Sequence, residues 1–246
     1  MAAPEPPPFQ TLTVSIEGPL GRLTLSQPDR LNPIGSTALA ELVEAAAWFD
    51  AVGATVVIVG GAGRAFSAGF DLRELSAPPV DPGVRSPELG AAMAEAVAGV
   101  QAVTIAAVQG PCVGGGFVLA LCCDLRVAGD DAWFSLPEVE LGIPLAWGGV
   151  PRLVREIGPA RATELVLTGR RVPAAEALGM GLLNRVAPAG EHQRAAEELA
   201  EVLLRRRAEV VATTKRQVAE AASALVPTDG AWAGTEHLVE ALRALA

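Results

Sequence analysis

Residues 110–121, with the sequence GPCVGGGFVLAL, place three consecutive glycines between two apolar segments. The preceding run Val103–Val108 (VTIAAV) has the β-branched, two-sided apolar character of a buried parallel strand. The residues from Gly115 to about Cys123 have the apolar content of a buried helix. Glycines at such a junction weaken both elements unless the backbone must adopt positive φ or approach another group closely. The segment therefore indicates either free N–H groups at a helix start, suited to an anion or oxyanion, or tight packing of the helix on the sheet.

Further strand and helix patterns on both sides of this segment predict a mixed α/β fold. A β-hairpin is predicted over residues 11–17 and 21–27, followed by a helix that runs from Ser36, its expected N-cap, to about Ala51. Other short apolar runs predict strands at residues 55–59, 125–128, 133–136 and 182–187. Helical patterns lie at residues 87–101, 148–157, 159–167, 173–178, 192–207, 209–224 and 232–245. Strands that alternate with helices at this spacing favour βαβ crossovers and a parallel sheet.

Three regions are predicted along the chain. Residues 1–9 form a disordered proline-rich tail, residues 10–186 form the α/β core, and residues 187–246 form a helical C-terminal region. The chain has 246 residues, half of them apolar, and a mean hydropathy of +0.35, which together exclude an intrinsically disordered protein. Its 19 basic and 28 acidic residues leave a net charge of −9, which disfavours binding to nucleic acid.

The three cysteines and two histidines do not form a recognisable metal or disulfide pattern. Cys122 and Cys123 are adjacent within an apolar run, and no second cysteine pair follows. Reduced thiols favour a cytoplasmic location, and the N-terminal residues lack the features of a signal peptide. No apolar run reaches the length that crosses a bilayer, so no membrane span is expected. The cysteine and histidine pattern predicts no metal site.

Two segments outside the glycine run carry carboxylates in places that suggest chemistry. In residues 64–74 (RAFSAGFDLRE), Gly69 and Asp71 lie at the start of an expected helical turn, which an ordinary capped turn also explains. Glu138 follows a proline and is surrounded by apolar residues, so burial would raise its pKa toward neutrality. A solvated turn is the alternative for Glu138 and the favoured interpretation for Glu140. The motifs of dinucleotide sites, Walker-type phosphate sites and α/β-hydrolases are absent from the sequence.

Taken together, these segments resemble those of the crotonase family, also called the enoyl-CoA hydratase/isomerase superfamily. The resemblance extends from Val14 to about Val218. It rests on five ordered motifs: PDRLNPI (28–34), AFSAGFDL (65–72), IAAVQGPCVGGGFVLALCCDLRVA (105–128), FSLPEVELGIPLAWGGVPRL (134–153) and AAEALGMGLLNRV (174–186). The resemblance implies a ββα spiral core, C-terminal helices that build a homotrimer or a dimer of trimers, and an acyl-CoA thioester of fatty acid metabolism as substrate.

The resemblance also implies which residues act on the substrate. By motif position, the backbone N–H groups of Phe70 and Gly115 correspond to the family's oxyanion hole, and Glu138 corresponds to one of two catalytic glutamates. The second glutamate would fall at Val118, which cannot transfer a proton. Hydration needs both an acid and a base, whereas one carboxylate suffices to move a double bond from the 3,4 to the 2,3 position. The pattern is therefore similar to that of one-glutamate members that isomerise 3-enoyl-CoA.

The same comparison implies a set of substrate-binding residues, and it leaves other activities open. The residues expected to line the substrate site are Ala68, Gly69, Phe70, Asp71, Leu72, Arg73, Arg30, Leu31, Gly114 and Val118. Arg73 is equally explained as a surface residue. CoA would enter as part of the substrate, with no separate cofactor and no metal. The alternatives are an acyl-CoA-binding protein with little catalysis, or another crotonase reaction such as decarboxylation or thioester hydrolysis.

Overall fold

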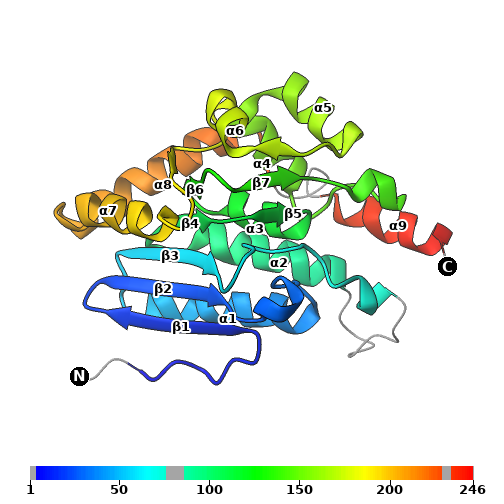
Figure 1. Cartoon of the computed structure of the whole chain (residues 1–246). Coiled ribbons are helices and arrows are strands. Elements are labelled where there is room, and N and C mark those ends of the chain that lie inside the picture. The colour runs from blue at the N-terminus through cyan, green and yellow to red at the C-terminus, as the bar shows by residue number, and fades with distance from the viewer. Residues whose placement is uncertain (1–3, 76–85, 229–233, 246) are drawn as a thin grey trace.

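The computed structural model describes residues 4–75, 86–228 and 234–245, and it has the mixed α/β architecture that the sequence predicts (Figure 1). The strands are β1 (Leu12–Glu17), β2 (Leu20–Leu25), β3 (Val56–Gly61), β4 (Val103–Val108), β5 (Pro111–Val113), β6 (Leu125–Gly129), β7 (Trp133–Ser135), β8 (Val172–Pro173) and β9 (Arg185–Ala187). The α-helices are α1 (Ser36–Ala51), α2 (Ser86–Gly99), α3 (Gly115–Cys122), α4 (Gly149–Ile157), α5 (Pro159–Thr168), α6 (Ala174–Met180), α7 (His192–Leu204), α8 (Ala208–Leu225) and α9 (Thr235–Leu245). Short 3-10 helices η1 (Pro28–Arg30), η2 (Leu72–Leu75) and η3 (Glu138–Leu141) lie in the loops.

The main sheet has the order β1-β2-β3-β4-β6-β9. Strands β1 and β2 form the predicted antiparallel hairpin, and every later neighbour in this sheet is parallel. Parallel neighbours require crossover connections, and α1, α2 and α3 supply them between successive strands. The predicted parallel sheet is therefore confirmed.

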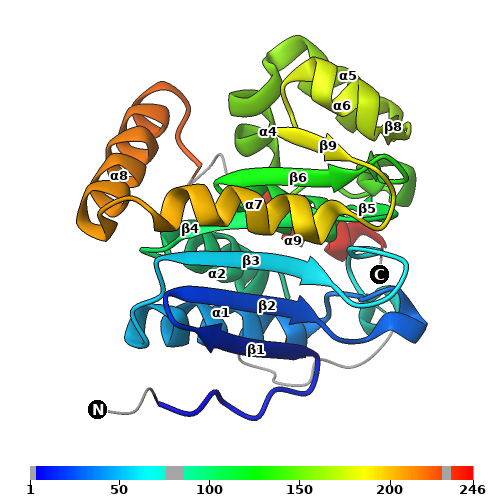
Figure 2. The same ribbon diagram turned by 60° about the vertical axis from the view of Figure 1, so that its left-hand side comes forward.

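Helices cover both faces of this sheet, which explains why every residue of its central strands β3 and β4 is buried. In β3, Val57 and Val59 belong to the large core that α1, α2 and α3 complete. Val56 and Ile58 point to the other face, where they pack with Ala196 of α7. Figure 2 shows α7 running across this second face. A strand buried on both sides has no polar face, as the run at residues 55–59 predicts.

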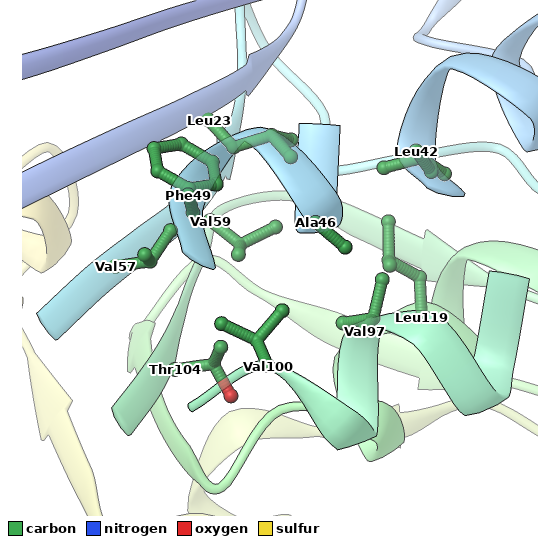
Figure 3. A pocket seen from close by; sticks show the side chains of 10 residues that line it. All are labelled: Leu23, Leu42, Ala46, Phe49, Val57, Val59, Val97, Val100, Thr104 and Leu119. Carbon is green, nitrogen blue, oxygen red and sulfur yellow. The ribbon is translucent and has the colours of Figure 1, made fainter. Parts of the chain in front are cut away.

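A small apolar gap lies within the large core, between β3, α1 and α2 (Figure 3). Its lining includes Leu23, Phe49, Val59 and Val100, and its single polar lining residue, Thr104, already donates a hydrogen bond to Asp124. The gap therefore belongs to the packing of the core and offers no polar group to a ligand.

Three local features differ from the expectations. Strands β5, β7 and β8 form a second, small sheet, and β5 and β8 are not predicted by the sequence because they contain three and two residues. Ser36 is the first residue of α1 rather than its N-cap, and Gly35 takes the cap position. The N–H and hydroxyl of Ser36 donate to Glu74 from the distant η2. The carboxylate of Glu74 therefore caps the N-terminus of α1, which is the role expected of the Ser36 side chain.

The two ends of the described chain contact the body differently. Within residues 4–9 the backbone carbonyl of Pro4 accepts a hydrogen bond from Trp48 Nε1, and Phe9 packs against the core. Helix α8 lies at the side of the molecule beyond α7 (Figure 2) and has no buried residue. The division into a disordered tail, a core and a C-terminal region stays a prediction. No helix among the described residues has the length and apolar content that a membrane span requires.

Candidate active site

Two loops that follow strands β3 and β4 lie side by side and begin the candidate site. Ser67 pairs with the residues around Cys112: its N–H donates to Pro111 O at 3.1 Å, and its carbonyl accepts from Val113 N at 3.0 Å. Gly69 follows with φ +92°, and a Cβ at that position would lie 2.7 Å from Val113 O. Glycine is thus required at position 69 by both its backbone conformation and its close approach to β5.

This arrangement brings the backbone N–H groups of Phe70 and Gly115 into neighbouring segments. Gly115 is the first residue of α3, so its N–H has no acceptor within the helix. A Cβ on Gly69 would lie 3.5 Å from Gly115 N, which shows how close the two segments are. Within residues 4–75, 86–228 and 234–245, neither N–H donates a hydrogen bond to the backbone or to a side chain. The two groups are therefore available as donors to a ligand, as an oxyanion hole requires.

Glu138 lies at the start of η3, directly beside the start of α3. The Gly114 N–H donates to Ser135 O at 2.9 Å, which ties the end of β7 to the residue that precedes α3. A Cβ on Gly114 would lie 2.8 Å from Glu138 Oε1, so the carboxylate rests against this glycine. The other oxygen, Oε2, is buried and has no hydrogen-bond partner among the described residues. Glu138 as a whole is half-buried, whereas Glu140 is exposed.

Burial changes the acid–base behaviour of this carboxylate. Loss of solvation raises the pKa of Glu138 from 4.5 to about 7, while a hydrogen bond from its own backbone lowers it by a smaller amount. A group with this pKa populates both its protonated and its ionised form near neutral pH. It can therefore accept a proton and return it without a large energetic cost.

Val118 lies one helical turn after Gly114, and its surroundings are apolar. Its side chain is 1% exposed, and its backbone N–H donates to Gly114 O at 3.0 Å. A Cβ on Gly149 would lie 3.0 Å from Val118 Cγ2 and equally close to Leu145. Position 118, where the family resemblance would place a second glutamate, therefore holds a buried apolar side chain in apolar surroundings.

Trp147 covers the start of α3 and contacts both donor segments. Its ring packs so closely on Gly115 that a Cβ there would lie 2.5 Å from Cζ3. Its ring centroid lies 6.2 Å from that of Phe70, with an edge-on angle of 73°. Trp147 has φ +57°, and Arg152 donates hydrogen bonds to the carbonyls of Trp147 and Gly148. Trp147 is not predicted from the sequence, because neither its positive φ nor the position of its ring follows from a local sequence pattern.

The residues expected to bind the CoA portion fall into two groups. Arg30 and Asp71 form an ion pair, and Ala68 N–H donates to Leu31 O at 2.8 Å, so these four lie together. Leu72 is exposed, and Arg73 N–H donates to Asp71 Oδ1 at 3.3 Å while its side chain faces solvent. Arg73 therefore lies on the surface directly beside Asp71. Within the described part of the chain, no cluster of three or more His, Cys, Asp or Glu side chains could hold a metal ion.

Asn32 is a further residue of the candidate site and is not predicted from the sequence. It is 1% exposed, with φ +53°, and its amide nitrogen donates to the carbonyls of Ala65 and Phe66 at 2.9 and 3.3 Å. The backbone carbonyl of Asn32 accepts a hydrogen bond from Ser67 Oγ at 2.7 Å. Asn32 thus holds the loop that leads to Phe70. The only sequence signal is its place next to a proline in PDRLNPI.

Comparison with known proteins identifies the fold and the family of this chain. The family model described as enoyl-CoA hydratase/isomerase matches residues 15–234. A protein of Rhizobium meliloti named "Probable enoyl-CoA hydratase" is 40% identical over 181 residues, which cover 72% of this chain and 69% of the relative. Enoyl-CoA hydratase subunit I of Geobacillus kaustophilus superposes with a TM-score of 0.81 at 34% identity, covering 96% of this chain and 90% of that one. A Thermobifida fusca protein, described as a candidate enoyl-CoA hydratase and solved with CoA, superposes with a TM-score of 0.80 at 31% identity, covering 99% and 97%.

These matches define a crotonase-type acyl-CoA enzyme, as the resemblance predicts. The chain belongs to the enoyl-CoA hydratase/isomerase family. The curated relative and the solved structures carry hydratase names, and none of these three is named an isomerase.

Proposed function

We propose that the protein isomerises 3-enoyl-CoA thioesters to 2-enoyl-CoA thioesters, with Glu138 as the only proton-transferring side chain. The observation that carries the proposal is the pairing of one carboxylate, which has a buried and unpartnered oxygen, with an apolar residue at the second position. Glu138 Oε2 has no partner among the described residues, while Val118 packs closely against Gly149.

In the first step the ionised Glu138 takes a proton from the carbon next to the thioester carbonyl. The electron pair of the broken C–H bond moves toward the carbonyl oxygen, giving a dienolate. The N–H groups of Phe70 and Gly115 are free to donate to this oxygen, and each such donor contributes about 3–4 kcal/mol in measured oxyanion holes.

In the second step the protonated Glu138 returns the proton at the γ-carbon. The electron pair moves back from oxygen, the double bond forms between the α- and β-carbons, and Glu138 is ionised again. No atom is gained or lost overall. A pKa of about 7 supports both steps, because the group is neither too strong an acid to accept a proton nor too weak to return it.

Hydration of 2-enoyl-CoA is the second candidate, because the similar proteins carry hydratase names. Hydration needs one group to activate water and another to protonate the α-carbon. A site with a single carboxylate therefore supports it less well than isomerisation.

Incubation with a 3-enoyl-CoA and, separately, a 2-enoyl-CoA in deuterated water distinguishes the candidates. Mass spectrometry should find 2-enoyl-CoA with carbon-bound deuterium from the first substrate, and the Glu138→Gln variant should not produce it. Efficient formation of 3-hydroxyacyl-CoA from the second substrate would instead favour hydration. Binding of both thioesters without turnover or deuterium would favour an acyl-CoA-binding protein, and release of free CoA would favour thioester hydrolysis.

We further propose that the chain assembles as a homotrimer or a dimer of trimers and works in the cytoplasm. Helix α8 supports an assembly, because none of its residues is buried and Val210, Val218 and Leu225 are exposed on it. Light scattering on the purified protein should give the mass of three or six chains of 25.2 kDa each. A monomeric mass would contradict this proposal.

A further inference from the structure

The indole of Trp147 fills the space between the starts of two helices beside the donor groups. On one side the ring packs on Gly115 of α3, where a Cβ would lie 2.5 Å from Cζ3 and 2.9 Å from Cη2. On another side it packs on Gly90 of α2, where a Cβ would collide with Nε1. Only glycine leaves room for the ring at these two positions.

The ring is also closed off from solvent by the protein itself. Trp147 is 6% exposed, and the edge of its ring meets the ring of Phe70. Because Phe70 and Gly115 carry the two donor N–H groups, the indole borders the place where the thioester oxygen of a substrate would be held. An acyl chain cannot extend between α2 and α3 while the indole occupies that space.

A buried arginine holds the indole in this position through the backbone. Arg152 is 6% exposed and donates to Trp147 O at 3.3 Å, to Gly148 O at 3.2 Å and to Ala94 O of α2 at 3.4 Å. It thereby links the turn that carries the indole to the helix against which the indole packs. Trp147 is thus fixed at φ +57° rather than free to swing away.

We propose that Trp147 determines acyl-chain selectivity and restricts the enzyme to short-chain acyl-CoA thioesters. This inference rests on the acyl-CoA site of the proposed function. It does not depend on which reaction Glu138 performs. Arg152 is a positioning residue in this arrangement, because it acts through the backbone of Trp147.

Binding of saturated, unreactive thioesters tests the selectivity without requiring turnover. We would measure the affinity for butyryl-CoA, decanoyl-CoA and CoA alone by titration calorimetry, in the wild type and in Trp147→Gly and Trp147→Phe variants. Glycine removes the ring and accepts positive φ without strain, whereas phenylalanine keeps an aromatic ring. Trp147 Nε1 has no hydrogen-bond partner among the described residues, so the phenylalanine variant loses no such bond.

The wild type should bind butyryl-CoA more tightly than decanoyl-CoA. Trp147→Gly should raise the affinity for decanoyl-CoA relative to butyryl-CoA by about tenfold, the smallest effect that a change of pocket size typically gives. Trp147→Phe should keep the wild-type ratio. If the glycine variant does not fold, as circular dichroism would show, Trp147→Leu takes its place with the same expected direction.

Three outcomes separate this inference from the proposed function. An unchanged ratio in folded Trp147→Gly, or a wild type that prefers decanoyl-CoA, would overturn the role of Trp147 alone. The expected change in ratio without any isomerisation would support the role of Trp147 and refute the isomerase proposal. Failure to bind every acyl-CoA would overturn both.

Discussion

Ser67 Oγ donates a 2.7 Å hydrogen bond to the backbone carbonyl of Asn32, and the same oxygen accepts a 3.1 Å hydrogen bond from Gly69 N–H. Ser67 and Asn32 are both buried. The hydroxyl therefore connects the loop after η1 to the backbone that precedes Phe70. In the proposed function this connection positions the Phe70 N–H, one of the two oxyanion donors.

Replacing Ser67 by alanine should lower kcat while changing KM little. The variant leaves the Gly69 N–H and the Asn32 carbonyl buried without a partner, and each such group costs about 1–3 kcal/mol. A misplaced donor weakens stabilisation of the dienolate, so we expect kcat to fall about tenfold or more. Steady-state kinetics with a 3-enoyl-CoA measure the effect. Ser15→Ala on the exposed face of β1 is the matched control, and an equal loss in both variants would contradict the positioning role.

Gly69→Ala should abolish activity and destabilise the protein. Alanine at φ +92° is strained, and its Cβ would lie 2.7 Å from Val113 O, so the loop and β5 must separate. We expect a loss of stability of about 2 kcal/mol, measured by urea unfolding. Gly179→Ala in α6 is the matched control, since its Cβ meets no atom within 4 Å and its φ is not positive. That change should leave activity intact and stabilise the helix by up to about 1 kcal/mol. A Gly69→Ala variant with wild-type kcat would contradict the proposed geometry.

Much of the fold follows from patterns that occur within single segments. Val103–Val108 is predicted as a strand with its exact limits, because two-sided burial leaves a continuous apolar run. The prediction of a helix from Gly115 is confirmed for a similar reason, since α3 is buried along its whole length. Phe70, Gly115 and Glu138 were singled out by the order of the motifs, and the structure brings their segments together.

Other features depend on residues that are distant in sequence, and no local pattern reveals them. Glu74 caps α1 from across a loop, which displaced the expected cap at Ser36. Strand β8 consists of Val172–Pro173 and exists only because β7 pairs with it. The backbone of Trp147 takes positive φ where Arg152 of α4 holds its carbonyl. In each case a tertiary contact decides the local conformation.

The rate of isomerisation should rise with pH through about 7. In the proposed mechanism the ionised form of Glu138 is the base, and burial raises its pKa from 4.5 to about 7. The pH profile of kcat/KM reports this pKa in the free enzyme. A profile that is flat between pH 5.5 and 8.5 would contradict the assignment of Glu138 as the base.

The same shift should make the wild type less stable as the pH rises, relative to Glu138→Gln. The folded state holds the proton more tightly than the unfolded state, so the folded protein binds more protons between pH 4.5 and about 7. Stability from this group is fully present below pH 4.5 and is lost as the pH rises through about 7. The loss amounts to about 3 kcal/mol. Glutamine does not ionise, so the difference between the two proteins in urea unfolding should grow over this pH range and then stay constant.

Lys215 should be required for the attachment of α8. It is the only lysine in the chain, and its Nζ lies 2.7 Å from Asp124 Oδ2 and donates to Ala102 O at 2.8 Å. Its side chain is 10% exposed, although α8 has no buried residue. Lys215→Met leaves Asp124 without its cation and should cost about 3 kcal/mol. Arg216→Met, on the exposed face of the same helix, should change stability by less than about 0.5 kcal/mol. Urea unfolding and limited proteolysis of α8 measure both variants, and equal effects would contradict the special role of Lys215.

Val118→Glu should shift the enzyme from isomerisation toward hydration. The new carboxylate would stand one helical turn after Gly114, against which Glu138 Oε1 rests, and would supply the second proton-transferring group that hydration needs. Because Val118 is 1% exposed and closely packed against Gly149, the variant should also be less stable, by about 2 kcal/mol. Its yield of 3-hydroxyacyl-CoA from 2-enoyl-CoA should rise about a hundredfold, measured by mass spectrometry. Val118→Gln has nearly the same shape without the charge and should show no such gain. If the glutamate and glutamine variants both fold and hydrate equally slowly, the missing carboxylate at position 118 is not what limits hydration in this site.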